Sequence, residues 1–247
     1  LANLLQAISF GAVCCNYTRL RAFLLQEGRV CGGAVEDVFT GRTMEVRAQA
    51  VINATGPWAD HLRRLSDGAA VARLAPTKGI HLVIPRVAQQ ALFVQARSDR
   101  RLFFILPWGE YSLVGTTEQS LDGSLDALRA NGSEVGYLLD EVNRVLPGSR
   151  VQEDEIIATF AGARPLLGFS GSATQASREY RIEIDGHGLM SVMGGKYTTY
   201  RVMAKEAVDA LIRRHRWQAD RCLTDQVSLL EMPQPIALDH WHHVIRR

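Results

Sequence analysis

The sequence predicts an α/β (α+β) fold in which a β-meander is followed by an antiparallel sheet. Short β-rich runs alternate with turn residues over residues 11–54, which is the pattern of a meander. Further β-rich runs without intervening helices, over residues 79–116, indicate an antiparallel sheet. Apolar residues at helical spacing, in residues 133–146 and from Thr198 onward, predict two amphipathic helices.

The meander is expected to lead into a strand, a turn and a helix. Its four predicted strands lie at residues 12–17, 23–25, 31–39 and 44–52. The last strand ends in a continuous apolar run at residues 50–52, which is typical of a strand buried on both faces. A turn at residues 53–58 follows, and Pro57 suits the first turn of a helix that extends through Leu65.

The second β-rich part continues the chain after a loop near Gly68. Its predicted strands lie at residues 79–85, 91–95, 102–106 and 111–116. The helix at residues 133–146 has Ser133 as its predicted N-cap, and Pro147 stops it. Three more strands are expected before the final helix, at residues 156–160, 181–184 and 189–193.

The composition indicates a globular protein without a global field for nucleic acid. Lys and Arg number 28 against 26 Asp and Glu, so the formal charge is only +2 and any anion site must be local. The apolar runs are far shorter than the roughly 20 residues that span a bilayer. We therefore expect no transmembrane segment and no nucleic-acid partner.

The cysteines and the terminal histidines carry no pattern of a metal site. Four cysteines form no CxxC pair, which indicates reduced thiols in a cytoplasmic protein, and Cys14 and Cys15 would point to opposite faces of a strand. The cluster of His240, His242 and His243 lacks partner ligands at a recognised spacing, so a solvated tail is expected there.

The two ends of the sequence suggest a piece of a longer protein. The first residues include neither an initiator Met nor the sections of a signal peptide, so the chain is expected to begin inside a larger protein. The last thirty residues are irregular and contain Pro233 and Pro235. We expect a linker, or the start of a further domain, at residues 216–247.

Three short stretches have the residues of a ligand site. Gly56 ends a strand in a turn where a missing Cβ lets a ligand approach the backbone, although an ordinary strand-to-helix turn has the same residues. Arg164 precedes a proline that favours extended backbone, and its guanidinium can bind a phosphate through two hydrogen bonds or form a surface salt bridge. In the third stretch, Lys196 supplies a point charge beside Gly194 and Gly195.

The third stretch also begins a helix. The N-terminus of a helix is electropositive, so Thr198 and Thr199 lie where a developing negative charge would be stabilised. Either threonine can equally be a plain N-cap, and both interpretations can hold together.

Taken together and in this order, residues 51–58, 162–166 and 194–201 resemble the FAD-dependent glycerol-3-phosphate dehydrogenases, within the D-amino-acid-oxidase-like flavoproteins. The resemblance covers roughly residues 10–215. It implies FAD as cofactor, glycerol 3-phosphate as substrate, dihydroxyacetone phosphate as product and quinone as electron acceptor. A cytoplasmic protein, peripherally associated with the inner face of the cytoplasmic membrane, is compatible with that acceptor.

The resemblance also implies roles for individual residues. Arg164 and Lys196 would bind the substrate phosphate, and His81 together with Arg164 would be catalytic. The residues implied to contact the cofactor are Ala54, Thr55, Gly56, Trp58, Gly194, Gly195, Lys196, Thr198 and Thr199. The His81 imidazole titrates near neutral pH and can accept the hydroxyl proton, but a lone histidine among apolar residues is often a core residue. The family usually has a small residue where Ile80 stands.

The same resemblance implies a division into domains. A partial FAD-binding domain is expected at residues 1–71, a substrate domain at 72–160 and a return to the first domain at 161–215. The glycine fingerprint for a pyrophosphate is missing, since Ser191 stands where a third glycine would follow Gly186 and Gly188. FAD binding by these residues alone is therefore not expected.

Two alternatives remain open at the level of sequence. In an amino-acid or hydroxy-acid oxidase of the same superfamily, Arg164 would bind a carboxylate and Lys196 would be superfluous. In an inactive binding or remnant domain, the half site would hold no cofactor.

Overall fold

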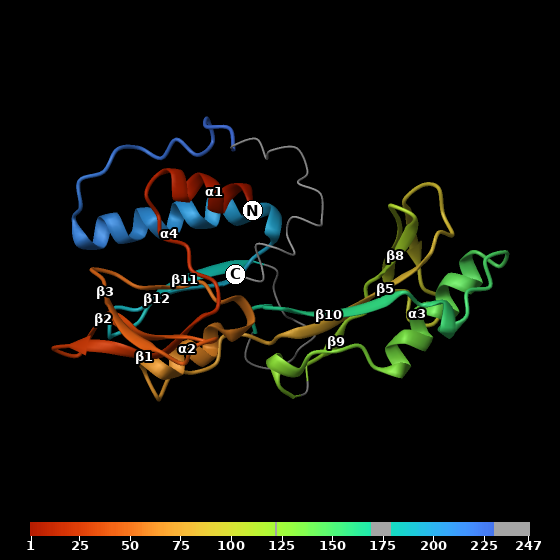
Figure 1. Cartoon of the computed structure of the whole chain (residues 1–247), viewed down its shortest axis with the longest axis horizontal. Helices are drawn as coiled ribbons and strands as arrows, with labels where there is room; N and C mark the ends of the chain where they lie inside the picture. The colour runs from red at the N-terminus through yellow and green to blue at the C-terminus, as the bar shows by residue number, and fades with distance from the viewer. Residues whose placement is uncertain (122, 169–178, 230–247) are drawn as a thin grey trace.

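The computed structural model describes residues 1–121, 123–168 and 179–229, and it shows two lobes arranged along the long axis (Figure 1). The elements of the first lobe are α1 (Ala2–Ser9), β1 (Thr18–Gln26), β2 (Arg29–Asp37), β3 (Thr43–Arg47), β4 (Ile52–Asn53), η1 (Gly56–Trp58), α2 (Ala59–Ser66), β11 (Tyr180–Ile184), β12 (Met190–Gly194), η5 (Tyr197–Thr199) and α4 (Tyr200–His215). The elements of the second lobe are β5 (Thr77–Pro85), β6 (Leu92–Gln95), β7 (Leu102–Trp108), β8 (Tyr111–Gly115), β9 (Gln119–Ser120), η2 (Leu125–Ala127), α3 (Gly132–Val145), η3 (Glu153–Glu155) and β10 (Ala158–Arg164).

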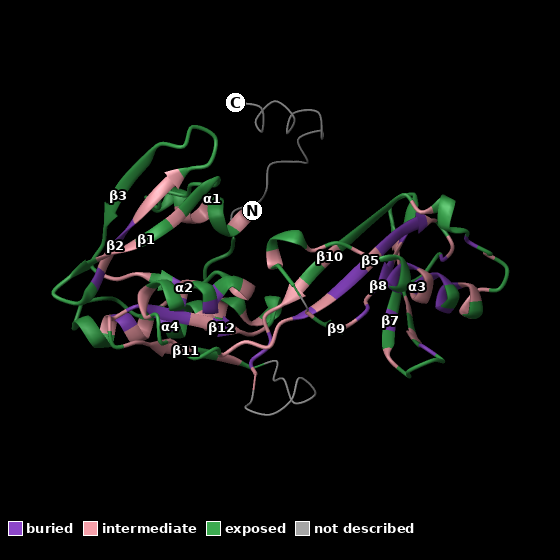
Figure 2. Ribbon diagram, turned by 90° about the horizontal axis from the view of Figure 1, so that it is seen from below, coloured by how far each residue is buried: buried purple, intermediate pink, exposed green. Residues whose placement is uncertain are grey.

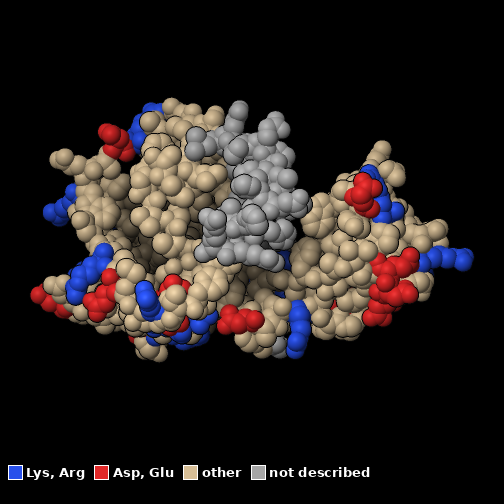
Figure 3. Space-filling view, in the orientation of Figure 1, with Lys and Arg blue, Asp and Glu red and all other residues tan. Residues whose placement is uncertain are grey.

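The predicted fold class is confirmed, since a meander and a larger antiparallel sheet are both present. The domain boundaries stay a prediction. The histidine cluster and both C-terminal prolines lie outside the described residues. Charged side chains of both signs are interspersed on the face that Figure 3 shows, as the small net charge leads one to expect.

The meander consists of β1, β2 and β3, in that order. Glu27 and Gly28 both have positive φ, 53° and 74°, and form the two-residue turn that sets the register of the first hairpin. The prediction of a strand at residues 12–17 is wrong. That segment follows an unpredicted helix, α1, and β2 pairs with the chain only from Thr18 onward. Cys14 and Cys15 are both exposed in this irregular segment.

The predicted strand at residues 44–52 is two strands in different sheets. β3 pairs with β2, whereas β4 pairs in parallel with β12 through Met190 opposite Ile52 and Ser191 opposite Asn53. The expectation that the apolar run is buried on both faces is also wrong, because the side chain of Ile52 is 40% exposed. The reason is positional: β4 lies at the edge of the described sheet β11-β12-β4.

The second lobe is built on a six-stranded antiparallel sheet in the order β10-β5-β8-β7-β6, with β9 pairing to β5. Helix α3 packs against one face of it, where Ile80, Leu82 and Ile84 of β5 are fully buried. Figure 2 shows β5 as a long, largely buried strand between β10 and β8. The N-cap of α3 is Asn131, not Ser133, because the Asn131 side chain accepts from the backbone N–H of Glu134 in a capping box.

The opposite face of this sheet carries a different set of side chains. Residues two apart on a strand share a face, so Gly79 and His81 of β5 lie opposite the core side. β10 continues beyond its predicted end as far as Arg164, and its register places Phe160 beside His81 and Arg164 beside Thr77.

Candidate active site

The three motifs found in the sequence meet at the junction of the two lobes. Ala59, Leu167 and Met193 form one buried cluster. Each of these residues adjoins a different motif: Ala59 follows η1, Leu167 follows the end of β10, and Met193 directly precedes Gly194 and Gly195. Helix η1 also contacts both β10 and β12. Segments more than a hundred residues apart in the sequence therefore meet around this buried cluster.

The turn after β4 is held by a buried asparagine. Asn53 is 2% exposed, and its Nδ2 donates to the carbonyl of Ala59 at 2.9 Å and to the hydroxyl of Ser191 at 3.2 Å. Its Oδ1 accepts from the Thr55 hydroxyl at 2.7 Å. These bonds join the turn to α2 and to β12, so they fix the positions of Ala54, Thr55 and Gly56.

The backbone at Gly56 is open. Its φ is +57°, a conformation that favours glycine, and no atom lies within 4 Å of the point that a Cβ would occupy. Ala54 and Thr55 are exposed beside it. Trp58 lies at the end of η1 and its indole N–H donates to Asp126 of η2 at 3.0 Å. Trp58 therefore bridges the lobes in addition to any contact with a ligand.

Arg164 and His81 lie on the open face of the large sheet. The Arg164 guanidinium reaches from β10 across β5, where Nη2 donates to the Thr116 hydroxyl at 2.8 Å and to the Thr117 carbonyl at 3.1 Å. The His81 ring stacks on Phe160, with centroids 4.9 Å apart and planes 12° apart. The two functional side chains thus come from adjacent strands and share a surface.

Burial is the main cause of a lowered pKa at His81, and the positive charge of Arg164 adds to it. Both effects disfavour the imidazolium. The neutral ring, which is the form able to accept a proton, therefore persists to a lower pH than for an exposed histidine. A half-buried histidine on an open face differs from the satisfied core residue that the sequence left as an alternative.

The two glycines of the third motif pack closely against other parts of the protein. Gly194 and Gly195 have φ of +76° and +88°, but the space that they clear is taken by protein atoms. A Cβ at Gly194 would meet the Glu179 carbonyl and Leu167, and one at Gly195 would lie 2.5 Å from the sulfur of Met203. The missing side chains of these two residues therefore serve the packing of β12 and α4 against their neighbours.

Lys196 and the two threonines follow these glycines. Lys196 is exposed, and within the described ranges it makes no ion pair. Thr199 is the N-cap residue of α4, but its hydroxyl donates to the carbonyl of Lys196 at 2.9 Å and does not cap the helix. Thr198 lies with it in η5, at the N-terminal end of α4, so the expected electropositive helix end is present.

A family of known proteins shares this arrangement. The family model described as FAD dependent oxidoreductase matches residues 1–201. The chain belongs to the FAD-dependent oxidoreductases.

Relatives in this family have a more specific name. The chain is 36% identical over 228 residues to glycerol-3-phosphate dehydrogenase 2 of Mycobacterium tuberculosis, which covers 91% of this chain and 38% of the relative. It is also 36% identical over 231 residues to the mitochondrial glycerol-3-phosphate dehydrogenase of Homo sapiens, covering 89% of this chain and 32% of that protein. The chain thus spans a minor part of the length of each relative.

Solved structures agree with these similarities. Glycerol-3-phosphate dehydrogenase from Bacillus halodurans, complexed with FAD, has a TM-score of 0.82 and 30% identity, over 90% of this chain and 43% of that one. Glycine oxidase from Geobacillus kaustophilus has a TM-score of 0.55 and 20% identity, over 92% of this chain and 56% of that one. The second likeness shows the fold alone.

Two residues of this candidate site could not be recognised as such from the sequence patterns used above. Asn53 falls within the predicted turn at residues 53–58, and an asparagine directly after an apolar strand is a signal for a buried polar group that orders the turn. Thr116 was predicted only as the end of a strand. Its contact with Arg164 spans 48 residues of sequence, so no local pattern could reveal it.

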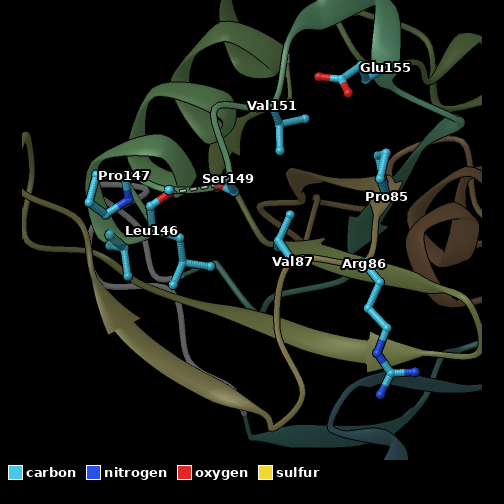
Figure 4. Close-up of a pocket in the computed structure, with 10 residues that line it drawn as sticks. Pro85, Arg86, Val87, Leu146, Pro147, Ser149, Val151 and Glu155 are labelled. Carbon is cyan, nitrogen blue, oxygen red and sulfur yellow. Dashed lines mark hydrogen bonds between the residues drawn. The ribbon is translucent and has the colours of Figure 1, made fainter.

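Two cavities lie away from this site. One of about 520 Å³ is formed by the end of β5 and the segment after α3, and Figure 4 shows Pro85, Val87 and Val151 around it. A second cavity of about 700 Å³, mostly apolar, lies between α1, α4 and residues 220–229. Of the described residues that line them, none belongs to the predicted site.

Proposed function

We propose that these residues form the substrate-facing part, and some of the flavin-facing part, of an FAD-dependent glycerol-3-phosphate dehydrogenase. The reaction would oxidise sn-glycerol 3-phosphate to dihydroxyacetone phosphate. One observation carries the proposal: Arg164 and His81 share the open face of a sheet whose edge meets the turn at Gly56. The names of the relatives supply the substrate.

The substrate phosphate is assigned to two cations. The planar guanidinium of Arg164 is held by Thr116 and Thr117, which limits its orientation and suits a geometric match to phosphate oxygens. Lys196 is exposed and flexible, and acts as a point charge on the same group. Because the net charge of the chain is small, this binding is local rather than a property of the whole surface.

His81 is assigned the proton of the substrate's 2-hydroxyl group. Its lowered pKa keeps the imidazole in the neutral form, which can accept a proton, at neutral pH. FAD, when bound, accepts the hydride that leaves C2. Transfer of the hydroxyl proton to His81 leaves the carbonyl group of the product, so the two transfers together account for both hydrogens.

The residues at the lobe junction fit a dinucleotide. The backbone at Gly56 is open, with Ala54 and Thr55 exposed next to it, as the close approach of a cofactor requires. Thr198 and Thr199 lie at the N-terminal end of α4, where the helix dipole favours negative charge on a ligand. Trp58, Gly194, Gly195 and Lys196 complete the proposed cofactor side of the site.

The electron acceptor is proposed to be a quinone, as in the family that the sequence resembles. No helix in the described part of the chain is long and apolar enough to cross a membrane. A peripheral association with the inner face of the cytoplasmic membrane would bring the site to a quinone. Reduction of a soluble quinone analogue by the complete protein, followed by absorbance, tests this acceptor.

The phosphate assignment is tested in the complete protein that contains these residues. Arg164→Ala and Lys196→Ala should each weaken transition-state binding of glycerol 3-phosphate by about 2–4 kcal/mol, since each removes a charge-assisted contact. Glycerol has no phosphate, so its kcat/KM should fall less. Steady-state kinetics with a dye acceptor measure both values.

Lys205→Ala provides the matched control, because it removes an exposed cation that pairs with Asp209 on the same helix. It should behave as wild type with both substrates. Equal losses for glycerol 3-phosphate and glycerol in the Arg164 and Lys196 variants would exclude the phosphate role. Oxidation of amino acids or hydroxy acids instead would favour an oxidase.

A further inference from the structure

The sheet is interrupted beside Arg164. β8 pairs with β5 as far as Gly115 opposite His81, and β9 resumes the pairing at Gln119 opposite Lys78. Residues 116–118 leave the regular ladder between these points. The Thr117 hydroxyl replaces a ladder bond by accepting from the backbone N–H of Ile80 at 3.0 Å. This interruption turns the Thr116 hydroxyl and the Thr117 carbonyl toward the guanidinium.

Gly79 provides the space in which the guanidinium lies. A Cβ built on Gly79 would be 2.5 Å from Nη2 of Arg164, 2.7 Å from Nη1 and 2.5 Å from the Thr116 hydroxyl oxygen. Such distances are well below van der Waals contact. Any larger residue at this position would therefore displace the guanidinium from its two acceptors.

Gly115 has the same relation to His81. A Cβ at Gly115 would collide with Cδ2 of the imidazole and lie 2.8 Å from Cγ and 2.9 Å from Nε2. On the other neighbouring strand, Phe160 stacks against the same ring. The imidazole thus lies between the ring of Phe160 on β10 and Gly115 on β8, which has no side chain.

Neither glycine is needed for a left-handed backbone. Neither Gly79 nor Gly115 has a positive φ, in contrast to Gly194 and Gly195. The three atoms nearest to each added methyl group are side-chain atoms, of Arg164 and Thr116 at Gly79 and of His81 at Gly115. Alanine at either position can therefore be accommodated by movement of a functional side chain, with the sheet intact.

We infer that Gly79 and Gly115 are positioning residues of the active site, one for each functional side chain. Gly79 keeps the Arg164 guanidinium against the sheet, where it binds the phosphate. Gly115 keeps the His81 imidazole against the sheet, where it accepts the proton. This inference rests on the proposed function. It assigns phosphate binding to a glycine on β5 and proton transfer to a glycine on the adjacent strand β8.

The test uses Gly79→Ala and Gly115→Ala in the complete, FAD-loaded protein. Gly79→Ala should raise the KM for glycerol 3-phosphate about tenfold, as expected for a weakened charge-assisted contact, with kcat largely kept. Gly115→Ala should lower kcat about 10²-fold through misplacement of the base, with a smaller change in KM. The pKa of the displaced imidazole should also rise toward the ordinary value of histidine. The pH at which kcat/KM increases should therefore shift upward.

Gly136→Ala is the matched control, because it adds a methyl group on α3 with no atom within 4 Å. It should match wild type in both constants. The inference is overturned if KM and kcat change by the same factors in Gly79→Ala as in Gly115→Ala, or if both variants match the control. Bound FAD and thermal unfolding, measured for each variant, identify a loss that comes from unfolding alone.

A binding measurement separates this inference from the proposed function. If the wild type does not oxidise glycerol 3-phosphate, the proposed function fails, and titration calorimetry with inorganic phosphate then tests the position of Arg164. Gly79→Ala should weaken phosphate binding about tenfold, while Gly115→Ala should not. Equal binding by wild type and Gly79→Ala, or no binding by the wild type, overturns the role of Gly79.

Discussion

The two faces of the large sheet differ in what their side chains do. On the face covered by α3, Ile80, Leu82 and Ile84 are fully buried in an apolar core. On the other face, β5 presents Gly79 and His81, and the neighbouring Phe160 is 44% exposed. One strand thus contributes to stability with one set of alternate residues and to the proposed chemistry with the other. The two-residue period of a strand keeps the two roles apart.

The covered face is closed by polar contacts as well as apolar ones. Lys78 pairs with the fully buried carboxylate of Glu134 at 2.6 Å, and Glu134 also completes the capping box of α3. Removal of either partner would leave a buried charge without compensation. Substitutions on this face are consequently expected to reduce stability, and those on the open face to reduce activity.

The largest effect is expected from His81→Asn, which keeps much of the shape but removes the base. In the complete protein, the rate of the reductive half-reaction should fall about 10²–10⁴-fold, the usual contribution of one general base. In the wild type, kcat/KM should rise with pH through an apparent pKa below the ordinary value of histidine, because burial and then Arg164 lower it.

Rates measured against pH, with substrate deuterated at C2, show whether hydride transfer is being followed. Arg164→Ala serves as a second probe. Loss of the Arg164 charge should raise the pKa of His81, so the remaining kcat/KM should rise at a higher pH. A His81→Asn variant with an unchanged rate and the same limb would assign the proton to another group.

The next effect concerns the covered face. Leu82→Ala should lower the free energy of unfolding by about 2–5 kcal/mol, because it opens a cavity in a fully buried core. Phe104→Ala is the comparison on the open face, where the ring is 44% exposed, and it should cost less. Denaturant unfolding curves measure both. Similar losses at the two positions would contradict the division between the faces.

The smallest effect is expected at the start of α3. Asn131→Ala removes the N-cap and should lower the free energy of unfolding by about 1 kcal/mol. Ser133→Ala, at the position that the sequence alone favoured as the cap, should change it much less. Thermal unfolding of both variants decides between them, and a larger loss for Ser133→Ala would show that the capping box does not control this end of the helix.

Much of the fold was predictable because it depends on local patterns. Apart from the short β9, the strands of the large sheet and both long helices followed from hydrophobic spacing, which reflects the period of each element. Arg164 and Lys196 were identifiable from two of the three stretches whose order and spacing resemble one family, and that resemblance in turn singled out His81. The sequence by itself therefore determined the fold class and the residue types of the proposed site.

Tertiary structure decided the relations between distant segments. Asn53 contacts Ser191 across 138 residues, and Arg164 contacts Thr116 across 48, so neither pair has a local signature. The exposure of Ile52 depends on the edge position of β4, and the role of each glycine depends on what lies next to it. Local periodicity predicts which way a side chain points, but only the packed chain determines what it meets.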